Sequence, residues 1–304
     1  MSFQMDRRIP EQMQTMLAQQ YTEEECARIQ DGFLSERITT LRVNRLKATG
    51  EEVRALLDTA GVPWQSVPWY EDALCLPAGS ETLLKTLPMY TEGKIYIQGL
   101  SAMLPALLLA PRAGESILDM AAAPGGKTTQ IAALSADKAS VTACERDARR
   151  AERLKYNIRT QGMSKVTVMN QDARQLDDMF RFDKILLDVP CTGSGTLKLN
   201  TEMPRRMEND WIRRIVRTQQ NMLDKALRLL KKGGLLVYST CSILRQENED
   251  NVDRILNKNN VSLVPVPDEL VRSIPGLSVT IPGTYCVQPS REFEGFFVAC
   301  LQKK

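Results

Sequence analysis

The sequence predicts a Rossmann-like α/β fold, with a mostly parallel sheet and a smaller α+β region at the N-terminus. From Gly93 onward, strand-like apolar runs alternate with helical patterns, which is typical of a parallel sheet covered on both faces. In Ile117–Thr128, ILDMAAAPGGKT, an apolar run ends at an acid and a turn of small residues opens a helix. Acidic or reactive residues also follow one expected strand after another. In an open α/β sheet, these strand ends border the ligand-binding crevice.

The smaller region comprises residues 1–92 in this interpretation. Pro10–Asp31, rich in Gln, Glu and Met, predicts a helix, and Thr39–Lys47 predicts a strand with basic residues on one side. A second helix is expected at Glu51–Ala60, because glycine and proline follow it closely. Val62–Pro77 predicts a loop with short strands.

The larger region comprises residues 93–304. It begins with a strand at Lys94–Gln98 and an apolar helix at Ser101–Leu109. Strands and helices then alternate. The strands are expected at Ser116–Met120, Ala139–Cys144, Val166–Met169, Lys184–Leu187 and Gly234–Ser239, and the helices at Gly126–Leu134, Asp147–Gln161, Met207–Lys231 and Glu247–Lys258. Val261–Val266 and Phe293–Leu301 predict late strands without a helix-length segment between them, which fits an antiparallel hairpin at one sheet edge.

The composition excludes whole classes of catalysis. The chain has no histidine, so serine–histidine and cysteine–histidine mechanisms are impossible. Its seven cysteines are scattered without metal-ligand spacing, and we expect no metal site. Any base or nucleophile must therefore be Cys, Asp, Glu, Lys or Tyr.

Charge and hydropathy indicate the surroundings in which the chain works. The longest apolar run, Ala106–Ala110, is too short to span a bilayer, and the N-terminal residues lack the apolar core of a signal peptide. We expect a cytoplasmic protein. The net charge is only +3, but Arg146–Arg159 and Lys198–Arg217 carry six basic residues each. Such clusters favour a polyanionic partner, with a solvated helix face as the alternative.

The turn after Asp119 predicts a small-ligand site. Its residues lack bulk, so a ligand can lie directly on the backbone N–H groups. Glu145 ends the next strand, 26 residues later, where an acid is suited to hydrogen-bond the ribose hydroxyls of a nucleoside cofactor. Alternatively, Glu145 is an exposed acid that starts a helix. Asp172 could meet an adenine amino group or merely cap a turn.

Two cysteines follow two other strands. Asp188–Gly195, DVPCTGSG, places an acid and a thiol three residues apart, and Tyr238–Ile243, YSTCSI, supplies a second thiol. A single cysteine is usually a small buried hydrophobe, but two at adjoining strand ends beside an acid indicate chemistry. Methylation of carbon 5 of a pyrimidine needs such a set. A thiolate adds to carbon 6, an acid hydrogen-bonds the ring, and a second base removes the proton from carbon 5.

DMAAAPGGKT, DVPCTGSG and STCS, in this order and separation, resemble the motifs of the Sun-type RNA cytosine-5 methyltransferases. LRVNRLK, IYIQGLSAM and EGFFVACL resemble the family's N-terminal motif, its pre-core segment and its last strand. The resemblance implies a class I methyltransferase sheet with S-adenosylmethionine as cofactor. It implies methyl transfer to carbon 5 of cytosine in RNA through a covalent cysteine–carbon 6 intermediate. Ribosomal RNA is the default substrate for such a chain, and transfer RNA remains open.

The resemblance also implies roles for single residues. Cys241 is the nucleophile, Cys191 assists product release, and Asp188 and Lys127 complete the catalytic set. Residues around the cofactor are Ala121, Ala122, Ala123, Pro124, Gly125, Gly126, Lys127, Glu145, Arg150, Asp172 and Asp188. Departures from the family pattern are Ala121, where the family often has cysteine, and Gln288-Pro289-Ser290, where it often ends in Pro-His.

Three alternatives stay open at this point. Cys191 could attack instead, because its Asp-Val-Pro-Cys setting resembles the nucleophile loop of DNA cytosine-5 methyltransferases. Ala121–Thr128 also fits the loose phosphate-loop pattern of an NTPase, although Asp119 would repel a triphosphate. A catalytically inactive RNA-binding module would be expected to have lost a cysteine or the acid. We expect a monomer that contacts RNA phosphates through Leu41–Lys47 and Lys198–Arg217.

Overall fold

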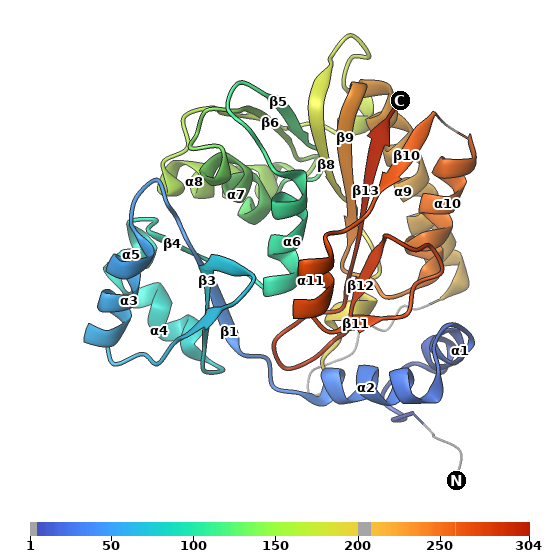
Figure 1. The fold of residues 1–304 in the computed structure, drawn as a ribbon, viewed down its shortest axis with the longest axis horizontal. Coiled ribbons are helices and arrows are strands. Elements are labelled where there is room, and N and C mark those ends of the chain that lie inside the picture. Colours follow the sequence, from blue (N-terminus) through green and yellow to red (C-terminus); the bar gives the residue numbers. More distant parts are fainter. Residues whose placement is uncertain (1–4, 200–207, 259) are drawn as a thin grey trace.

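The computed structural model describes residues 5–199, 208–258 and 260–304, and within them the chain forms a four-stranded and a nine-stranded sheet (Figure 1). The middle of the basic cluster Lys198–Arg217, and Met207 at the start of an expected helix, lie outside the described residues. Figure 1 shows the small sheet beside the large one, with the two N-terminal helices beneath the large sheet.

The small sheet is antiparallel throughout, in the order β2-β3-β1-β4. Its strands are β1 (Thr39–Val43), β2 (Gln65–Val67), β3 (Tyr70–Leu76) and β4 (Ile95–Ile97), and the helices of this part are α3 (Gly50–Thr59), α4 (Ser80–Thr86) and α5 (Pro88–Thr91). Val53 and Leu57 of α3 and Leu84 of α4 bury their side chains in its core. The strand expected at Lys94–Gln98 pairs with β1 and so does not join the large sheet. The division at residues 92 and 93 stays a prediction.

The N-terminal segment forms two helices where a single one was expected. α1 (Glu11–Gln20) ends before Thr22, and α2 (Glu23–Leu34) begins directly after it. The Thr22 side chain accepts a hydrogen bond from the Glu25 N–H at 3.2 Å, and the Glu25 carboxylate accepts one from the Thr22 N–H at 3.0 Å. This reciprocal cap starts a new helix, and the Thr-x-x-Glu spacing was its signal. Both helices pack on the core of the large sheet.

The large sheet runs in the order β11-β12-β13-β9-β8-β5-β6-β7, with β10 also paired to β13. Its strands are β5 (Ser116–Asp119), β6 (Ser140–Cys144), β7 (Val166–Met169), β8 (Phe182–Asp188), β9 (Leu230–Thr240), β10 (Val261–Val264), β11 (Gly276–Leu277), β12 (Tyr285–Val287) and β13 (Phe296–Lys303). The strands β5 to β9 pair in parallel, whereas β10 to β13 add antiparallel pairs. The predicted mostly parallel sheet with an antiparallel edge is confirmed.

Helices cover both faces of this sheet. They are α6 (Leu100–Leu109), α7 (Gly126–Leu134), α8 (Ala148–Gln161), α9 (Asn209–Leu229) and α10 (Glu249–Lys258). Alternate residues of a strand point to opposite faces. Leu186 packs with α6 and α7, while its neighbours Ile185 and Leu187 pack with α9 and α10. Because β5 lies between β6 and β8, the strand order reverses there, and its carboxyl end is the expected ligand crevice.

The segment before the last strand differs from expectation. A six-residue helix, α11 (Asp268–Ser273), and the short strands β11 and β12 lie between β10 and β13. These elements are too short to give a clear periodic pattern. Pro267 and two acids at the start of α11 were the only local signs of a helix.

The two sheets are joined through buried polar side chains. Arg42 of β1 is 0% exposed, and it donates hydrogen bonds to the Gln98 side chain at 3.1 Å and to Thr129 Oγ1 at 3.1 Å. The expectation that Leu41–Lys47 contacts phosphates is therefore wrong for Arg42. Arg45 pairs with Glu71 at 2.6 Å and with Asp72. Arg42 therefore links the two sheets, whereas Arg45 pairs with β3 inside the small sheet.

Candidate active site

The loop between β5 and α7 lies at the crevice. Gly125 has φ 113°, and a Cβ there would stand 3.0 Å from Leu154 Cδ1, so only glycine fits this turn. Thr128, in the first turn of α7, donates a hydrogen bond to the Asp119 carboxylate at 2.7 Å. Burial raises the pKa of Asp119 to about 6, although Thr128 and Lys127 oppose that rise. The Asp119 carboxylate therefore ties the end of β5 to the first turn of α7.

Glu145 follows β6 and is only 3% exposed, which excludes the alternative of an exposed helix-starting acid. It accepts a hydrogen bond from the Asp147 N–H at 2.9 Å and forms an ion pair with Arg150 at 3.4 Å. Arg150 also donates to the Ala123 carbonyl at 2.8 Å. Arg150 thus ties the acid to the glycine-containing loop.

Asp172 follows β7 and caps the short turn at Ala173–Gln175 by accepting from the Arg174 N–H at 2.9 Å. The Arg174 guanidinium donates to the same carboxylate at 2.5 Å, and this hydrogen bond lowers the pKa of Asp172. The Asp172 carboxylate also borders the crevice, so its capping role is compatible with a contact to adenine.

Two adjoining cavities are lined by the predicted cofactor residues. One, of about 90 Å³, is bordered by Ala121, Glu145, Arg150 and Asp172. The other, of about 200 Å³, is bordered by Ala121, Ala122, Ala123, Pro124, Gly126, Lys127 and Asp188, together with Asp119 and residues of β4. Ala121 borders both cavities. Among the predicted cofactor residues, only Gly125, which forms the turn, borders neither cavity. An elongated ligand could therefore lie across the loop.

The two cysteines of the paired motifs lie side by side. Cys191 follows β8 and Cys241 follows β9, which are adjacent parallel strands. Their sulfur atoms are 2.8 Å apart, and neither forms a disulfide. The Gly195 N–H donates to the Cys241 carbonyl at 3.0 Å, and the Ser194 and Ser242 hydroxyls are hydrogen-bonded at 2.8 Å. These bonds hold the two loops together.

Asp188 and Lys127 form an ion pair of 2.8 Å beside the thiols. Ser239 donates to the other carboxylate oxygen of Asp188 at 2.7 Å. Burial lowers the pKa of Lys127, but the charge and hydrogen bond of Asp188 outweigh it, so the pKa of Lys127 is raised.

Cys191 ionises less readily than a free cysteine. The hydrogen bond with Cys241, together with burial, raises the pKa of Cys191 well above its usual value. Cys191 therefore keeps its proton while facing Cys241. Burial also raises the pKa of Cys75 to about 11 and the pKa values of Cys144 and Cys300 to about 12. Cys144 and Cys300 are buried and Cys75 is partly buried, and with these raised pKa values none of the three is a nucleophile.

Glu247 is a buried residue of this site that the sequence did not suggest. One carboxylate oxygen accepts from the Thr192 hydroxyl at 2.5 Å and the Ser242 hydroxyl at 2.6 Å. The other accepts from the Thr192 N–H and the Gln219 side chain, both at 2.9 Å. Thr192 follows Cys191 and Ser242 follows Cys241, so one carboxylate positions both cysteine loops. In the sequence, the only sign of Glu247 was the run of acids and amides that follows STCS.

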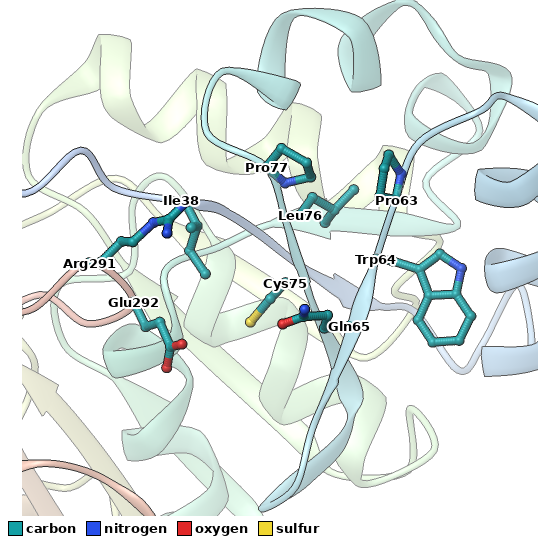
Figure 2. Close-up of a pocket in the computed structure, with 9 residues that line it drawn as sticks. All are labelled: Ile38, Pro63, Trp64, Gln65, Cys75, Leu76, Pro77, Arg291 and Glu292. Carbon is teal, nitrogen blue, oxygen red and sulfur yellow. The ribbon is translucent and has the colours of Figure 1, made fainter.

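A further cavity, of about 290 Å³, contains none of the predicted site residues. Figure 2 shows it between β2, β3 and the chain segment near the C-terminus. Its lining residues are Ile38, Pro63, Trp64, Gln65, Cys75, Leu76, Pro77, Arg291 and Glu292. The largely protonated Cys75 gives this cavity no nucleophile.

Neither a metal site nor a membrane span is found in the described part of the chain. No three acidic or cysteine side chains there gather closely enough to hold a metal ion. Across those same residues, every helix is too short or too polar to cross a bilayer.

Comparisons with known proteins agree with this architecture. The family "16S rRNA methyltransferase RsmB/F" matches residues 106–302, and an RsmF/B-like ferredoxin-like domain matches residues 9–81. A methyltransferase homolog protein from Pyrococcus horikoshii, whose structure is solved, is 30% identical with a TM-score of 0.81 and covers 97% of this chain and 100% of its own. It supports the class I methyltransferase sheet.

Two curated relatives come from bacteria. Ribosomal RNA small subunit methyltransferase F of Shewanella piezotolerans is 37% identical, over 87% of this chain and 57% of its own length. Ribosomal RNA small subunit methyltransferase B of Salmonella paratyphi B is 36% identical, over 87% of this chain and 59% of its own length. The chain therefore spans little more than half the length of these relatives.

Proposed function

The chain belongs to the RsmB/F family of 16S rRNA methyltransferases, the Sun-type family that its motifs resemble, and we propose that it methylates carbon 5 of a cytosine in RNA. The observation that carries this proposal is the pair of thiols, 2.8 Å apart, beside the Asp188–Lys127 ion pair and the glycine-containing loop. An NTPase would leave both thiols without a role.

S-adenosylmethionine is the proposed cofactor, and it supplies an electrophilic methyl group when bound. The two cavities on either side of Ala121 fit its elongated shape. Glu145, held by Arg150, would accept hydrogen bonds from the ribose hydroxyls, and Asp172 would face the adenine. The loop Ala121–Lys127 would hold the remainder with its backbone.

Cys241 is the proposed nucleophile. Its thiolate adds to carbon 6 of the base, which forms an S–C6 bond and makes carbon 5 nucleophilic enough to take the methyl group. The Lys127 ammonium, which its ion pair with Asp188 holds at the site, would offset the charge of this thiolate, as a nearby cation does for reactive cysteines. The Asp188 carboxylate, which accepts from Lys127 and Ser239, would orient the base by accepting from its exocyclic amino group, and the Lys127 ammonium would balance the negative charge that develops on the ring. Cys191, which keeps its proton, hydrogen-bonds the attacking thiolate.

Cys191 is the proposed releasing group. After methyl transfer, carbon 5 still carries its proton, and a base must remove it before the S–C6 bond can break. The hydrogen bond with Cys241 is the largest cause of the raised pKa of Cys191, and it is lost once the Cys241 sulfur is bonded to carbon 6. Cys191 then releases its own proton to solvent, and its thiolate takes the proton from carbon 5. The electron pair of the C5–H bond then forms the C5=C6 double bond, and the Cys241 thiolate leaves. Cys191 reaches this position because its loop is hydrogen-bonded to the Cys241 loop.

The names of the curated relatives favour RNA of the small ribosomal subunit as the substrate, with transfer RNA as the alternative. We further propose that the chain acts in the cytoplasm as a monomer. Residues 1–92 are proposed as the RNA-binding region and residues 93–304 as the catalytic domain.

The test is to incubate the protein with S-adenosylmethionine and unmodified RNA, and to analyse the digested nucleosides by mass spectrometry. Small-subunit ribosomal RNA and transfer RNA are compared in parallel, and bisulfite sequencing locates the site. We expect 5-methylcytidine in one RNA class and none with Cys241→Ala. Methylation of another base or atom would overturn the proposal. A melting temperature raised by ATP but not by S-adenosylmethionine would favour the NTPase.

A further inference from the structure

A polar groove runs between the small sheet and α8, on the outer side of the glycine-containing loop. Its volume is about 250 Å³, and its lining comes from α4, α5, β4 and α8. Tyr96, Ile97 and Pro124 border both this groove and the active-site cavity of about 200 Å³. The groove therefore adjoins the cavity that also contains Lys127 and Asp188.

Asn157 fixes the boundary between the two cavities. Its side-chain amide donates to the Pro124 carbonyl at 2.7 Å and approaches the Tyr96 hydroxyl at 3.4 Å. Helix α8 is thereby attached both to the loop that would hold the cofactor and to β4. A ligand in the groove would lie at a defined distance from the reacting base.

An exposed aromatic ring stands at this groove. Tyr156 is 59% exposed, and among the described residues the only other exposed aromatic side chain is Phe180. Phe180 stacks on Phe182 with ring centroids 6.1 Å apart, whereas Tyr156 faces no other ring in the described parts of the chain. A ring that buries so little adds little to folding, but it offers a flat surface for a nucleic-acid base.

Positive charge accompanies that ring. Arg149, Arg153, Tyr156 and Thr160 follow one another at intervals of four, three and four residues, so they share one face of α8. Arg153 borders the groove and has no carboxylate partner within the described segments. Glu81, the one carboxylate among the described lining residues, is paired with Lys85 at 2.5 Å. The groove therefore favours an anion such as a phosphate.

We infer that this groove binds an unpaired RNA nucleotide next to the target cytosine, with its base on Tyr156 and its phosphate on Arg153. The inference rests on the proposed function, because it requires an RNA substrate. The volume lies below the roughly 300 Å³ of the smallest typical small-molecule pockets. It suits one base of a longer chain better than a free ligand.

The experiment measures binding of a short, unstructured, cytidine-containing RNA labelled with a fluorophore, in the presence of S-adenosylhomocysteine. Tyr156→Ala should weaken binding about 5- to 150-fold, the effect of losing one stacked base. Tyr156→Phe, which keeps the ring, should bind like the wild type. Arg153→Gln should weaken binding and reduce the salt slope by about one.

Arg112→Gln is the matched control and should bind RNA like the wild type, since Arg112 is exposed, lies outside the basic clusters of α8 and α9, and borders neither the groove nor the cofactor cavities. All variants should bind S-adenosylhomocysteine with wild-type affinity. If the wild type binds and methylates RNA but Tyr156→Ala binds it equally well, the groove inference is wrong and the proposed function stands. If the wild type neither binds nor methylates any RNA, the proposed function fails and the inference with it.

Discussion

At the scale of single residues, Glu145 shows how a buried acid can be kept available for a ligand. Its partners are one N–H group and the Arg150 guanidinium, which leaves carboxylate lone pairs toward the smaller cavity. Glu145→Ala should weaken S-adenosylmethionine binding by ~1–3 kcal/mol, because hydrogen bonds to a charged group are lost. Isothermal titration calorimetry on the folded variant measures this.

The control for that prediction is Glu152→Ala, on the exposed side of α8, where Glu152 pairs with Lys155 at 2.7 Å. It should leave cofactor affinity unchanged. Equal affinity of Glu145→Ala and the wild type would count against the ribose contact.

The titration of Asp119 predicts how the free energy of unfolding changes with pH. Its pKa is raised to about 6 in the folded protein by burial, whereas an unfolded aspartate ionises near 3.9. The folded state therefore holds the proton more tightly. This contribution to stability is complete below pH ~4 and is lost as the pH rises through about 6. Relative to Asp119→Asn, the free energy of unfolding of the wild type should fall by up to about 3 kcal/mol across that range.

Urea unfolding of both proteins at a series of pH values tests this prediction. The difference between them isolates Asp119, because the remaining titratable groups are common to both. A difference that is constant or grows with pH would show that the carboxylate is ionised without penalty.

The sequence predicted which residues meet at the crevice better than it predicted the residues that position them. Cys191, Cys241 and Asp188 stand at strand ends, so the topology alone brings them together. Glu247 was missed because its partners, Thr192 and Gln219, lie far from it in the chain. Arg42 was misjudged for a related reason. A basic residue on a short strand looks exposed until the second sheet that covers it is known.

At the scale of elements, long periodic segments were predicted well and short ones were not. The helix expected at Asp147–Gln161 forms as α8 (Ala148–Gln161), because Asp147 caps its start and apolar residues recur along one buried face, at Ala151, Leu154 and Ile158. α4, α5 and α11 were not predicted, since each spans at most two turns and its packing decides its conformation. The break between α1 and α2 could have been found from the Thr22–Glu25 capping box.

Glu247 links the two cysteine loops, and Glu247→Gln tests that link. An amide in this position turns an N–H group toward neighbours that already donate hydrogen bonds. We expect a loss of about 1–3 kcal/mol in the free energy of unfolding and a lower kcat. Cofactor affinity should stay within about twofold, as for substitutions away from a site, because Glu247 borders neither cofactor cavity.

Denaturant unfolding, methyl-transfer kinetics and calorimetry measure these three quantities. Glu269→Gln, an exposed acid on α11, is the matched control. Wild-type turnover in folded Glu247→Gln would mean that the loops keep their positions without this carboxylate.

At the scale of the whole molecule, the two sheets form one catalytic unit. Arg42, Gln98 and Thr129 hydrogen-bond across their boundary, and Asn44 donates to the Gln161 carbonyl at 2.8 Å. The sequence predicted both regions but not this junction, because buried polar contacts leave no periodic pattern. The junction therefore fixes the position of the small sheet, the proposed RNA-binding region, relative to the loop between β5 and α7.

RNA binding should depend strongly on salt even though the net charge is only +3. The basic side chains are concentrated on α8 and near the start of α9, so a bound strand would displace counterions locally. Affinity for RNA should fall steeply between roughly 50 and 200 mM salt. Fluorescence anisotropy at several salt concentrations measures the slope, and a flat response would contradict electrostatic binding.

The central claim is that Cys241 attacks the base and Cys191 releases the product. Removing the attacking thiol prevents any covalent bond to RNA, whereas removing the releasing thiol allows attack and methylation but stops elimination. The two sulfur atoms are close enough for both to reach one base. The variants Cys241→Ala and Cys191→Ala therefore leave different products.

The most direct measurement is denaturing gel electrophoresis of each variant after incubation with S-adenosylmethionine and radiolabelled substrate RNA. The account predicts that Cys191→Ala accumulates a protein–RNA complex that survives denaturation, while Cys241→Ala forms none and transfers no methyl group. A covalent complex with Cys241→Ala and none with Cys191→Ala would contradict it and reverse the two roles.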